Sequence, residues 1–335
     1  MVETMTFKIR NKVAALAAAS ALVAALSGCG STPAPGAGGN GGAVERPTIT
    51  VGTQAFAELA PLHIAIKQGF FKDEGLDVKL TDATGGGAGL ITGLVSGNTD
   101  VVYSNYVSLI QGAAKGLPLR VIRENDRPGV QALYVKSDSS ISKPSDFAGK
   151  TIAINGFGNI MELTTRTVLG SHGVSQDQLK FIELAPPQME AALELGQVDA
   201  AWLVEPFVTI TTSKGGVKPV VSAFEGPTEN LPVAGWSVTD QFAKANPKTT
   251  AAFVRAMDKA MAVAVKDKAA VVDAITSYTK IPKEVADKMK PISFAEKSDL
   301  SSLSKVQDLM IERGIIDKPI NMEQFVVKVD TGAKG

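Results

Sequence analysis

Short apolar runs alternate with helix-length segments along most of the chain after residue 47. Three runs rich in β-branched residues predict strands in the first half: "TITVG" (48–52), "LDVKL" (76–80) and "DVVYS" (100–104). Helical patterns lie between them, in "LAPLHIAIKQGFF" (59–71) and "LITGLVSG" (90–97). This alternation is typical of βαβ units and predicts an α/β fold with mostly parallel sheets.

The same order of elements recurs about 100 residues later. "KTIAI" (150–154), "LKFIEL" (179–184) and "DAAWLV" (199–204) predict three more strands, with helical patterns between them. The motif Leu-x-x-Gly-x-x-Asp ends the second helix of each set, at 94–100 and at 193–199. Two common supersecondary units could coincide, but three matched strands in one order favour a pseudo-duplicated pair of lobes.

Two further strand-like runs are placed to connect the lobes. "VQALYVK" (130–136) carries the chain from the first lobe into the second, and "VAGWSV" (233–238) carries it back. We therefore expect lobe one over 48–131 and 235–335, lobe two over 132–234, and hinge crossings near 130–136 and 232–238. The helical patterns after residue 239 are expected to pack on lobe one, and Pro247 suits the first turn of one of them.

Residues 1–28 have the features of a secretory signal. Lys8, Arg10 and Lys12 precede the apolar run "VAALAAASALVAAL", whose 14 residues fall short of the ~20 that span a bilayer. The run ends in "LSGC", which matches a bacterial lipobox, and Cys29 is the only cysteine of the chain. We expect lipidation of Cys29, followed by a flexible Gly-, Pro- and Ser-rich tether at 29–47. The alternative is a soluble secreted chain with an incidental cysteine.

The charge of the chain gives no sign of a nucleic-acid partner. Lys and Arg number 34, as do Asp and Glu. Loss of Glu3, Lys8, Arg10 and Lys12 with the signal leaves 31 positive against 33 negative residues, a net charge of −2. No basic stripe is present, so nucleic-acid binding is not expected.

Several spaced motifs resemble the sulfonate/nitrate/taurine substrate-binding proteins of ABC importers. They are "PLHIAIKQGFFKDEGLDVKL", "LVSGNTDVVYS", "SDFAGKTIAI", "LELGQVDAAWLVEPF" and "FAKANPKTTAAFVRAM", and the similarity runs from about Thr48 to Phe325. The resemblance implies a two-lobed periplasmic-binding-protein-like fold of type II, with a small-molecule ligand in the cleft between the lobes. It also implies a monomer that delivers its cargo to an ABC permease and its ATPase complex. Lipidated Cys29 would be the only membrane contact, on the outer face of the cell membrane.

The ligand site is predicted from the ends of the strands. In open α/β sheets ligands bind beyond the carboxyl ends, where helix N-termini favour anions. The candidate ligand-binding residues are Gln54, Phe56, Gly85, Gly86, Gly87, Ser104 and Asn105 in lobe one, Asn155, Gly156, Phe157, Asn159 and Glu205 in lobe two, and Trp236 near the second crossing.

Several of these candidates also have structural interpretations. Asn159 and Glu162 have the spacing of a capping box, which would satisfy only their own helix. Phe56 and Phe157 could close on an apolar part of the ligand or belong to the core, and Trp236 could be cleft wall or core. Glu205 could meet an amine or orient a loop. Gly85 to Gly87 could form a flexible turn, and Trp202 is expected to be structural.

The pattern favours a binding protein that captures a small anionic organic solute, of the sulfonate, taurine, nitrate or carboxylate class, by closure of the lobes. The alternative cargo is a heteroaromatic pyrimidine of the thiamin-precursor type. A surface enzyme is not expected. His63 and His172, the only histidines, fall in helical segments, and with Cys29 lipidated no cysteine nucleophile is left. "NGFGN" (155–159) lacks the third glycine of a dinucleotide-binding loop. We expect no cofactor and no metal.

Overall fold

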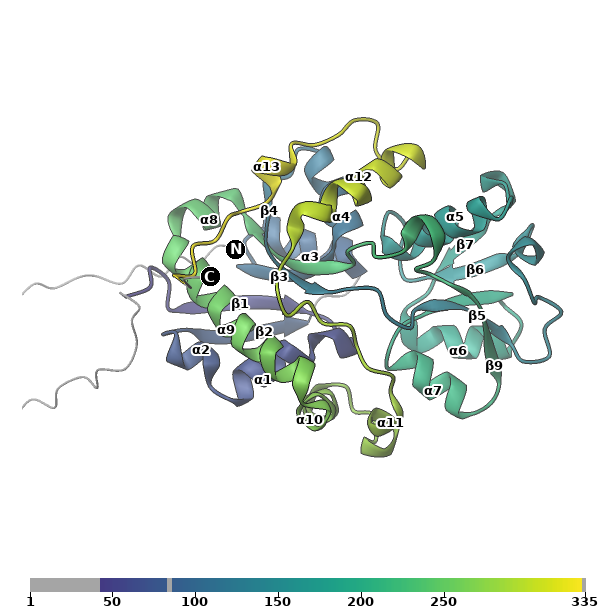
Figure 1. Ribbon diagram of the computed structural model, residues 1–335, viewed down its shortest axis with the longest axis horizontal. Coiled ribbons are helices and arrows are strands. Elements are labelled where there is room, and N and C mark those ends of the chain that lie inside the picture. The colour runs from purple at the N-terminus through teal and green to yellow at the C-terminus, as the bar shows by residue number, and fades with distance from the viewer. Residues whose placement is uncertain (1–42, 83–85, 333–335) are drawn as a thin grey trace, which may run out of the picture. The chain divides into compact units, whose positions relative to one another are not determined.

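A computed structural model describes residues 43–82 and 86–332 of the 335-residue chain. These residues form two β-sheets flanked by helices (Figure 1). The strands are β1 (Thr48–Thr53), β2 (Asp77–Asp82), β3 (Val101–Asn105), β4 (Leu119–Asp126), β5 (Ala132–Lys136), β6 (Thr151–Ile154), β7 (Lys180–Glu183), β8 (Ala200–Leu203), β9 (Val217–Ser222) and β10 (Ala234–Thr239).

The α-helices connect and cover these strands. They are α1 (Ala60–Lys67), α2 (Phe70–Asp73), α3 (Gly86–Val95), α4 (Tyr106–Ala114), α5 (Ile160–Ser171), α6 (Pro186–Glu194), α7 (Phe207–Ser213), α8 (Asp240–Ala245), α9 (Pro247–Lys266), α10 (Lys268–Tyr278), α11 (Lys283–Lys288), α12 (Leu303–Glu312) and α13 (Met322–Phe325). Short 3-10 turns lie at Ala57–Leu59, Pro144–Phe147, Gln176–Gln178, Gly226–Thr228 and Leu300–Ser302.

The two sheets have the same topology. Their strand orders are β2-β1-β3-β10-β4 and β7-β6-β8-β5-β9, and in each the fourth strand is antiparallel to both of its neighbours. That fourth strand is the first one after the chain passes from one sheet to the other. Strand β5 follows the passage into the second sheet, and β10 follows the passage back into the first. The first three strands of each sheet are parallel. From the first of these strands the chain moves to one neighbour and then crosses back to the other. Because both connections are right-handed, their helices lie on opposite faces of the sheet.

The repeated Leu-x-x-Gly-x-x-Asp motif has the same structural role in both sheets. The Asp100 carboxylate accepts a hydrogen bond from Thr50 N (2.8 Å), and the Asp199 carboxylate accepts one from Thr151 N (2.8 Å). Gly97 and Gly196, with φ of 79° and 67°, follow the preceding helices in the left-handed conformation that glycine adopts without strain. The motif therefore ends a helix and ties the next strand to the first strand of its sheet.

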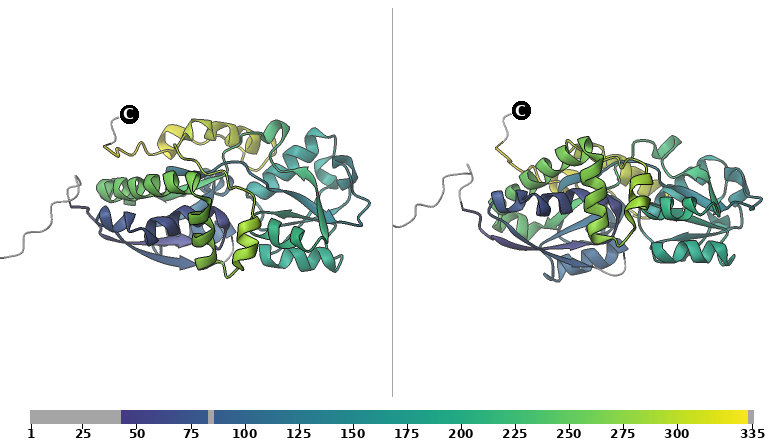
Figure 2. Two further views of the ribbon diagram at one scale, coloured as in Figure 1. Left: turned by 60° about the horizontal axis from the view of Figure 1, so that its bottom comes forward. Right: turned by 90° about the horizontal axis from the view of Figure 1, so that it is seen from below.

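The helices after residue 239 cover the first sheet. Helix α9 packs on α1 and α2, α12 packs on α4, and α13 packs on β4. Figure 2 shows α9 lying along the first sheet, while α11, in the same C-terminal set, reaches α7 beside the second sheet. No helix within residues 43–82 and 86–332 combines the length and apolar character needed to cross a bilayer.

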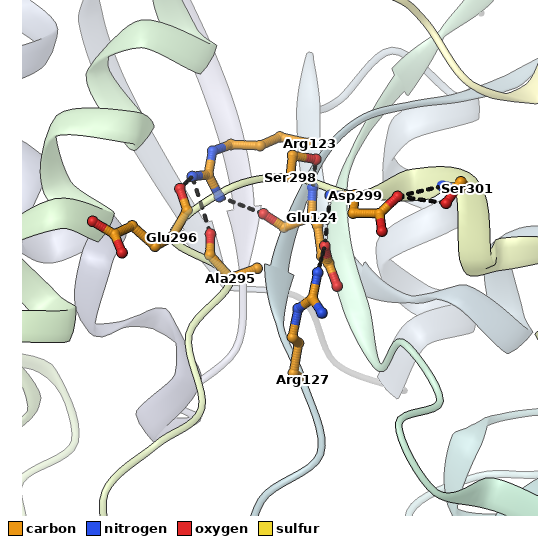
Figure 3. A network of polar contacts seen from close by, with 8 residues as sticks. All are labelled: Arg123, Glu124, Arg127, Ala295, Glu296, Ser298, Asp299 and Ser301. Carbon is orange, nitrogen blue, oxygen red and sulfur yellow. Dashed lines mark hydrogen bonds and ion pairs between the residues drawn. The ribbon is translucent and has the colours of Figure 1, made fainter. Parts of the chain in front are cut away.

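Strand β4 is held in place by the segment at 293–299, and Figure 3 shows the contacts. The fully buried Arg123 guanidinium donates to the backbone oxygens of Ala295 and Glu296, each at 3.2 Å. The Glu124 carboxylate accepts from Asp299 N (2.9 Å) and Arg127 Nη2 (2.9 Å). These bonds pair the buried charges of β4 and fix the end of the strand that leads to Asp126.

The predicted α/β class with two mostly parallel sheets is confirmed, and most predicted strands lie within two residues of those observed. The predicted helix at 59–71 is instead two helices, because Gly69 (φ 78°) interrupts it. Helix α3 begins at Gly86 and not at 90, and α4, α7, α10, α11 and α13 were not predicted individually. The lobe and hinge boundaries stay predictions, and the signal, Cys29 and the tether up to residue 42 lie outside the described residues.

Candidate ligand-binding cleft

A cavity of about 60 Å³ opens between the carboxyl ends of the strands of both sheets. The first sheet and its loops contribute most of the lining, and the second sheet contributes Asn155 after β6 and residues of α5 and of β8 and its end. The lining residues are Gln54, Phe56, Glu58, Gly87, Leu90, Tyr103, Ser104, Asn105, Asp126, Gln131, Asn155, Ile160, Met161, Trp202, Val204, Val233 and Ala234.

Two carboxyl groups form the buried base of this cavity. Glu58 is 4% exposed and Asp126 is fully buried. One oxygen of Asp126 accepts from Tyr103 OH (2.8 Å) and from Asn125 Nδ2 (3.1 Å), and one oxygen of Glu58 is 3.4 Å from Gln131 Nε2. The protein therefore orients both groups through one oxygen each. We call Glu58 and Asp126 the acidic pair.

Burial shifts the titration of the acidic pair. It raises the pKa of Asp126 to about 7 and, together with the charge of nearby Asp126, raises the pKa of Glu58 well above its ordinary value. The Glu205 carboxylate adds to the shift at Glu58. Burial also raises the pKa of the Tyr103 phenol, so Tyr103 stays a neutral donor to Asp126.

The walls of the cavity are apolar and aromatic. Leu90 comes from the first sheet's helix α3, and Met161 and Trp202 come from α5 and β8 of the second sheet. Trp202 is held by a hydrogen bond from its Nε1 to Thr164 Oγ1 (3.2 Å). Among the described residues that line the cavity, none is Lys, Arg or His. The site thus combines apolar walls, which include the Trp202 indole, with an acidic base.

Comparisons with known proteins agree with this architecture. The family model described as NMT1/THI5 like matches residues 57–270, more than half of the chain. The chain belongs to the NMT1/THI5-like family.

Relatives of this NMT1/THI5-like protein are named as binding proteins. The taurine-binding periplasmic protein of Escherichia coli (strain K12) is 29% identical over 62% of this chain and 63% of its own length. A Bacillus subtilis (strain 168) protein named for binding aliphatic sulfonates is 25% identical over 91% of this chain and 92% of its own. The solved alkanesulfonate-binding protein SsuA of Xanthomonas axonopodis pv. citri, bound to MOPS, has a TM-score of 0.73 and 19% identity, covering 85% of this chain and 99% of that one. These findings confirm the predicted family resemblance and the periplasmic-binding-protein-like fold.

Six of the predicted ligand-binding residues line the cavity: Gln54, Phe56, Gly87, Ser104, Asn105 and Asn155. A Cβ on Gly87 would lie 2.9 Å from Ser108 Oγ and about as close to the Asn105 and Ser104 side chains, so only glycine fits there. Gly86 does not line the cavity, and a Cβ placed on it would lie 3.5 Å from Asn155 O. Gly85 lies outside the described residues. Contact of any of these residues with a ligand stays a prediction.

The "NGFGN" loop forms hydrogen bonds within its own lobe. Phe157 N donates to Glu183 Oε1 (2.6 Å), and Gly158 N donates to Glu162 Oε2 (2.8 Å). Asn159 Oδ1 caps α5 by accepting from Met161 N (2.9 Å). Neither Gly156 nor Asn159 lines the cavity, and the Phe157 side chain is 55% exposed. Since carboxylates already occupy two of these N–H groups, we leave this loop out of the proposed site, apart from Asn155 at its start.

Glu205 and Trp236 also have structural partners. The Glu205 carboxylate accepts from Thr209 N (3.1 Å) and Thr209 Oγ1 (2.8 Å), which orients the start of α7. Trp236 is fully buried, and its Nε1 donates to Asn125 Oδ1 (2.9 Å). Asn125 in turn donates to Asp126, so Trp236 supports the base of the cleft without lining it.

Neither the acidic pair nor the contribution of Trp202 to the cavity wall was predicted from the sequence. Trp202 was expected to be structural only, yet it lines the cavity. One signal was available in the run "RENDR" (123–127), where charged residues interrupt an otherwise strand-like pattern. Charges inside a buried strand require partners, and Asp126 is the member of this run that lines the cavity. Within residues 43–82 and 86–332, no group of three or more His, Cys, Asp or Glu residues is arranged to hold a metal ion.

Proposed function

We propose that this protein is the extracytoplasmic solute-binding component of an ABC importer. It captures a small organic solute between its two lobes and delivers it to a membrane permease, while lipidated Cys29 keeps it at the outer face of the membrane. The observation that carries the proposal is the cavity lined by residues of both sheets in a chain of the NMT1/THI5-like family. The names of the taurine- and sulfonate-binding relatives support a small sulfonate or amino sulfonate as cargo.

Closure of the lobes is the mechanism that this geometry supports. The chain passes between the sheets at 127–131 and at 223–233, and bonds across the cleft join Ser108 Oγ to Gly158 O (3.2 Å) and Ala57 N to Glu205 O (3.4 Å). A ligand that touches both walls binds the closed form better than the open form. Such a ligand shifts the population toward closure, and the closed form docks on the permease.

A pyrimidine cargo of the thiamin-precursor type is the second candidate. Trp202 and Phe56 offer ring-sized apolar surfaces, and the acidic pair can accept hydrogen bonds from a ring amine. This cargo requires no cationic residue in the cleft, which fits the lining.

Thermal unfolding with a panel of solutes tests the proposed function. The protein would be produced from Ala43, where the described residues begin. The panel would contain taurine, alkanesulfonates, nitrate and aminopyrimidines. A true ligand at 100 times its Kd adds about 2.7 kcal/mol of stability. If none of these solutes raises the melting temperature or gives heat in a calorimeter, a receptor for these classes is refuted.

A further inference from the structure

Three buried oxygens at the base of the cleft have no hydrogen-bond partner within residues 43–82 and 86–332. They are Glu58 Oε2, Asp126 Oδ2 and Ser104 Oγ, and all three residues line the cavity. Each of these residues is at most 4% exposed. Buried polar atoms in folded proteins are nearly always paired. A cluster of three unpaired oxygens around one cavity therefore indicates the place where a ligand supplies the missing donors.

The acidic pair is oriented for this purpose. Tyr103 and Asn125 hold one oxygen of Asp126, and Gln131 holds one oxygen of Glu58, which leaves the second oxygen of each group free. When such a group ionises, both of its oxygens are acceptors, and a carboxylate binds charged donors more strongly than neutral ones.

The surroundings disfavour an anion at the same position. Besides Asp126, the Glu205 carboxylate lies near Glu58, and Glu124, which is paired with Arg127, lies near Asp126. The N–H groups of Phe157 and Gly158, which would attract an anion, are bound to Glu183 and Glu162. An anionic head group at the base would favour the protonated forms of Glu58 and Asp126, whereas an ammonium would pair with their ionised forms, and the described lining holds no cationic residue for an anion.

We propose that the cleft recognises its solute by an amino group that donates hydrogen bonds to Glu58, Asp126 and Ser104. This inference rests on the proposed function and specifies the chemistry of its site. An ammonium on an amino sulfonate and an exocyclic amine on a pyrimidine share this chemistry. The remainder of either solute would lie against Trp202 and Met161, with Gln54 and Asn155 among the polar residues of the lining.

Matched pairs of solutes in a calorimeter test the inference. Taurine is compared with isethionate, which has a hydroxyl in place of the amine, and 4-amino-2-methylpyrimidine is compared with 2,4-dimethylpyrimidine. We expect the amino member of at least one pair to bind about tenfold to a hundredfold more tightly, as a hydrogen bond to a charged group provides. Which pair responds distinguishes the two sources of the amine.

Variants locate the effect at the acidic pair. Glu58→Gln and Asp126→Asn should each weaken binding of the amino solute by about tenfold and leave its partner within about twofold. Asp138→Asn, at a side chain that is 80% exposed, is the control and should change neither.

A measurement on the unaltered chain keeps the test independent of how the variants fold. The ammonium of taurine stabilises the ionised forms of Glu58 and Asp126, so taurine binding near pH 6.5 should release protons. Calorimetry in buffers of different ionisation enthalpy measures the number of protons released. Proton uptake, or isethionate and nitrate binding as tightly as the amino solutes, would overturn the inference and leave the proposed function standing. No binding in any arm would overturn both.

Discussion

Replacing Asp126 by asparagine should flatten the dependence of the protein's stability on pH. Asp126 is fully buried, and burial raises its pKa from the ordinary 3.8 to about 7. Between these two values the folded protein holds a proton that the unfolded chain has lost. The free energy of unfolding therefore falls as the pH rises through this window.

The size of the effect follows from the two pKa values. The difference between 3.8 and about 7 corresponds to about 4 kcal/mol. This stabilisation is fully present below pH 3.8 and is lost as the pH rises through about 7. Asparagine does not titrate, so the wild-type protein should lose about 4 kcal/mol more than Asp126→Asn between pH 4 and pH 8.

Urea unfolding of ligand-free protein at several pH values measures this difference. Trp236 lies in β10, in the same sheet as Asp126, and the other tryptophan, Trp202, lies in β8 of the second sheet. A Trp202→Phe background therefore makes fluorescence report on the sheet that contains Asp126. Asp138→Asn, at an exposed position, should follow the wild-type curve. If the free energies of unfolding of the wild type and Asp126→Asn stay parallel within about 1 kcal/mol over this pH range, the raised pKa of Asp126 is refuted.

Three further changes test other parts of the structure. Gly87→Ala would place a Cβ 2.9 Å from Ser108 Oγ and should weaken solute binding by about tenfold, measured by calorimetry. Gly93→Ala in the same helix, with 3.6 Å of space, should bind normally, and equal affinities would contradict a tight fit at Gly87. Asn159→Ala removes the cap of α5 and should cost about 1 kcal/mol in urea unfolding with binding retained; a selective loss of binding would return Asn159 to the site. Cys29→Ser should move the protein from the membrane fraction to the medium, and unchanged fractionation would exclude the lipid anchor.

The duplicated architecture was predictable because it depends on local patterns. Each strand and helix of the repeat has its own apolar period, and the motif that ends in Asp100 or Asp199 makes its main contact within its own βαβ unit. The break at Gly69 was harder to predict, because an isolated glycine inside an apolar helical pattern is compatible with a continuous helix.

The acidic pair was not predictable by the same reasoning. Glu58 lies in a 3-10 turn after β1, and Asp126 ends β4, at the far edge of the same sheet order. Asn125 links them, because its Nδ2 donates to Glu58 O (2.9 Å) and to the Asp126 carboxylate. Trp236 of β10 orients Asn125 by donating from its Nε1 to Asn125 Oδ1. Trp236 belongs to β10, which follows all strands of the second sheet in the chain. A search limited to the ends of the repeated strands therefore could not find it.

The "NGFGN" loop shows that a correct local prediction does not decide which backbone N–H groups are available to a ligand. A strand, a glycine-rich turn and a helix start do occur there, and exposed N–H groups at such a turn attract anions. Here Glu183, which ends β7, and Glu162, one turn into α5, accept those hydrogen bonds. The polarity of a site depends on the groups that the fold leaves unpaired. In this cleft the loop's donors are occupied, while the acceptors of Glu58, Asp126 and Ser104 are left without partners among the described residues. The chemistry that completes the site is therefore that of a donor.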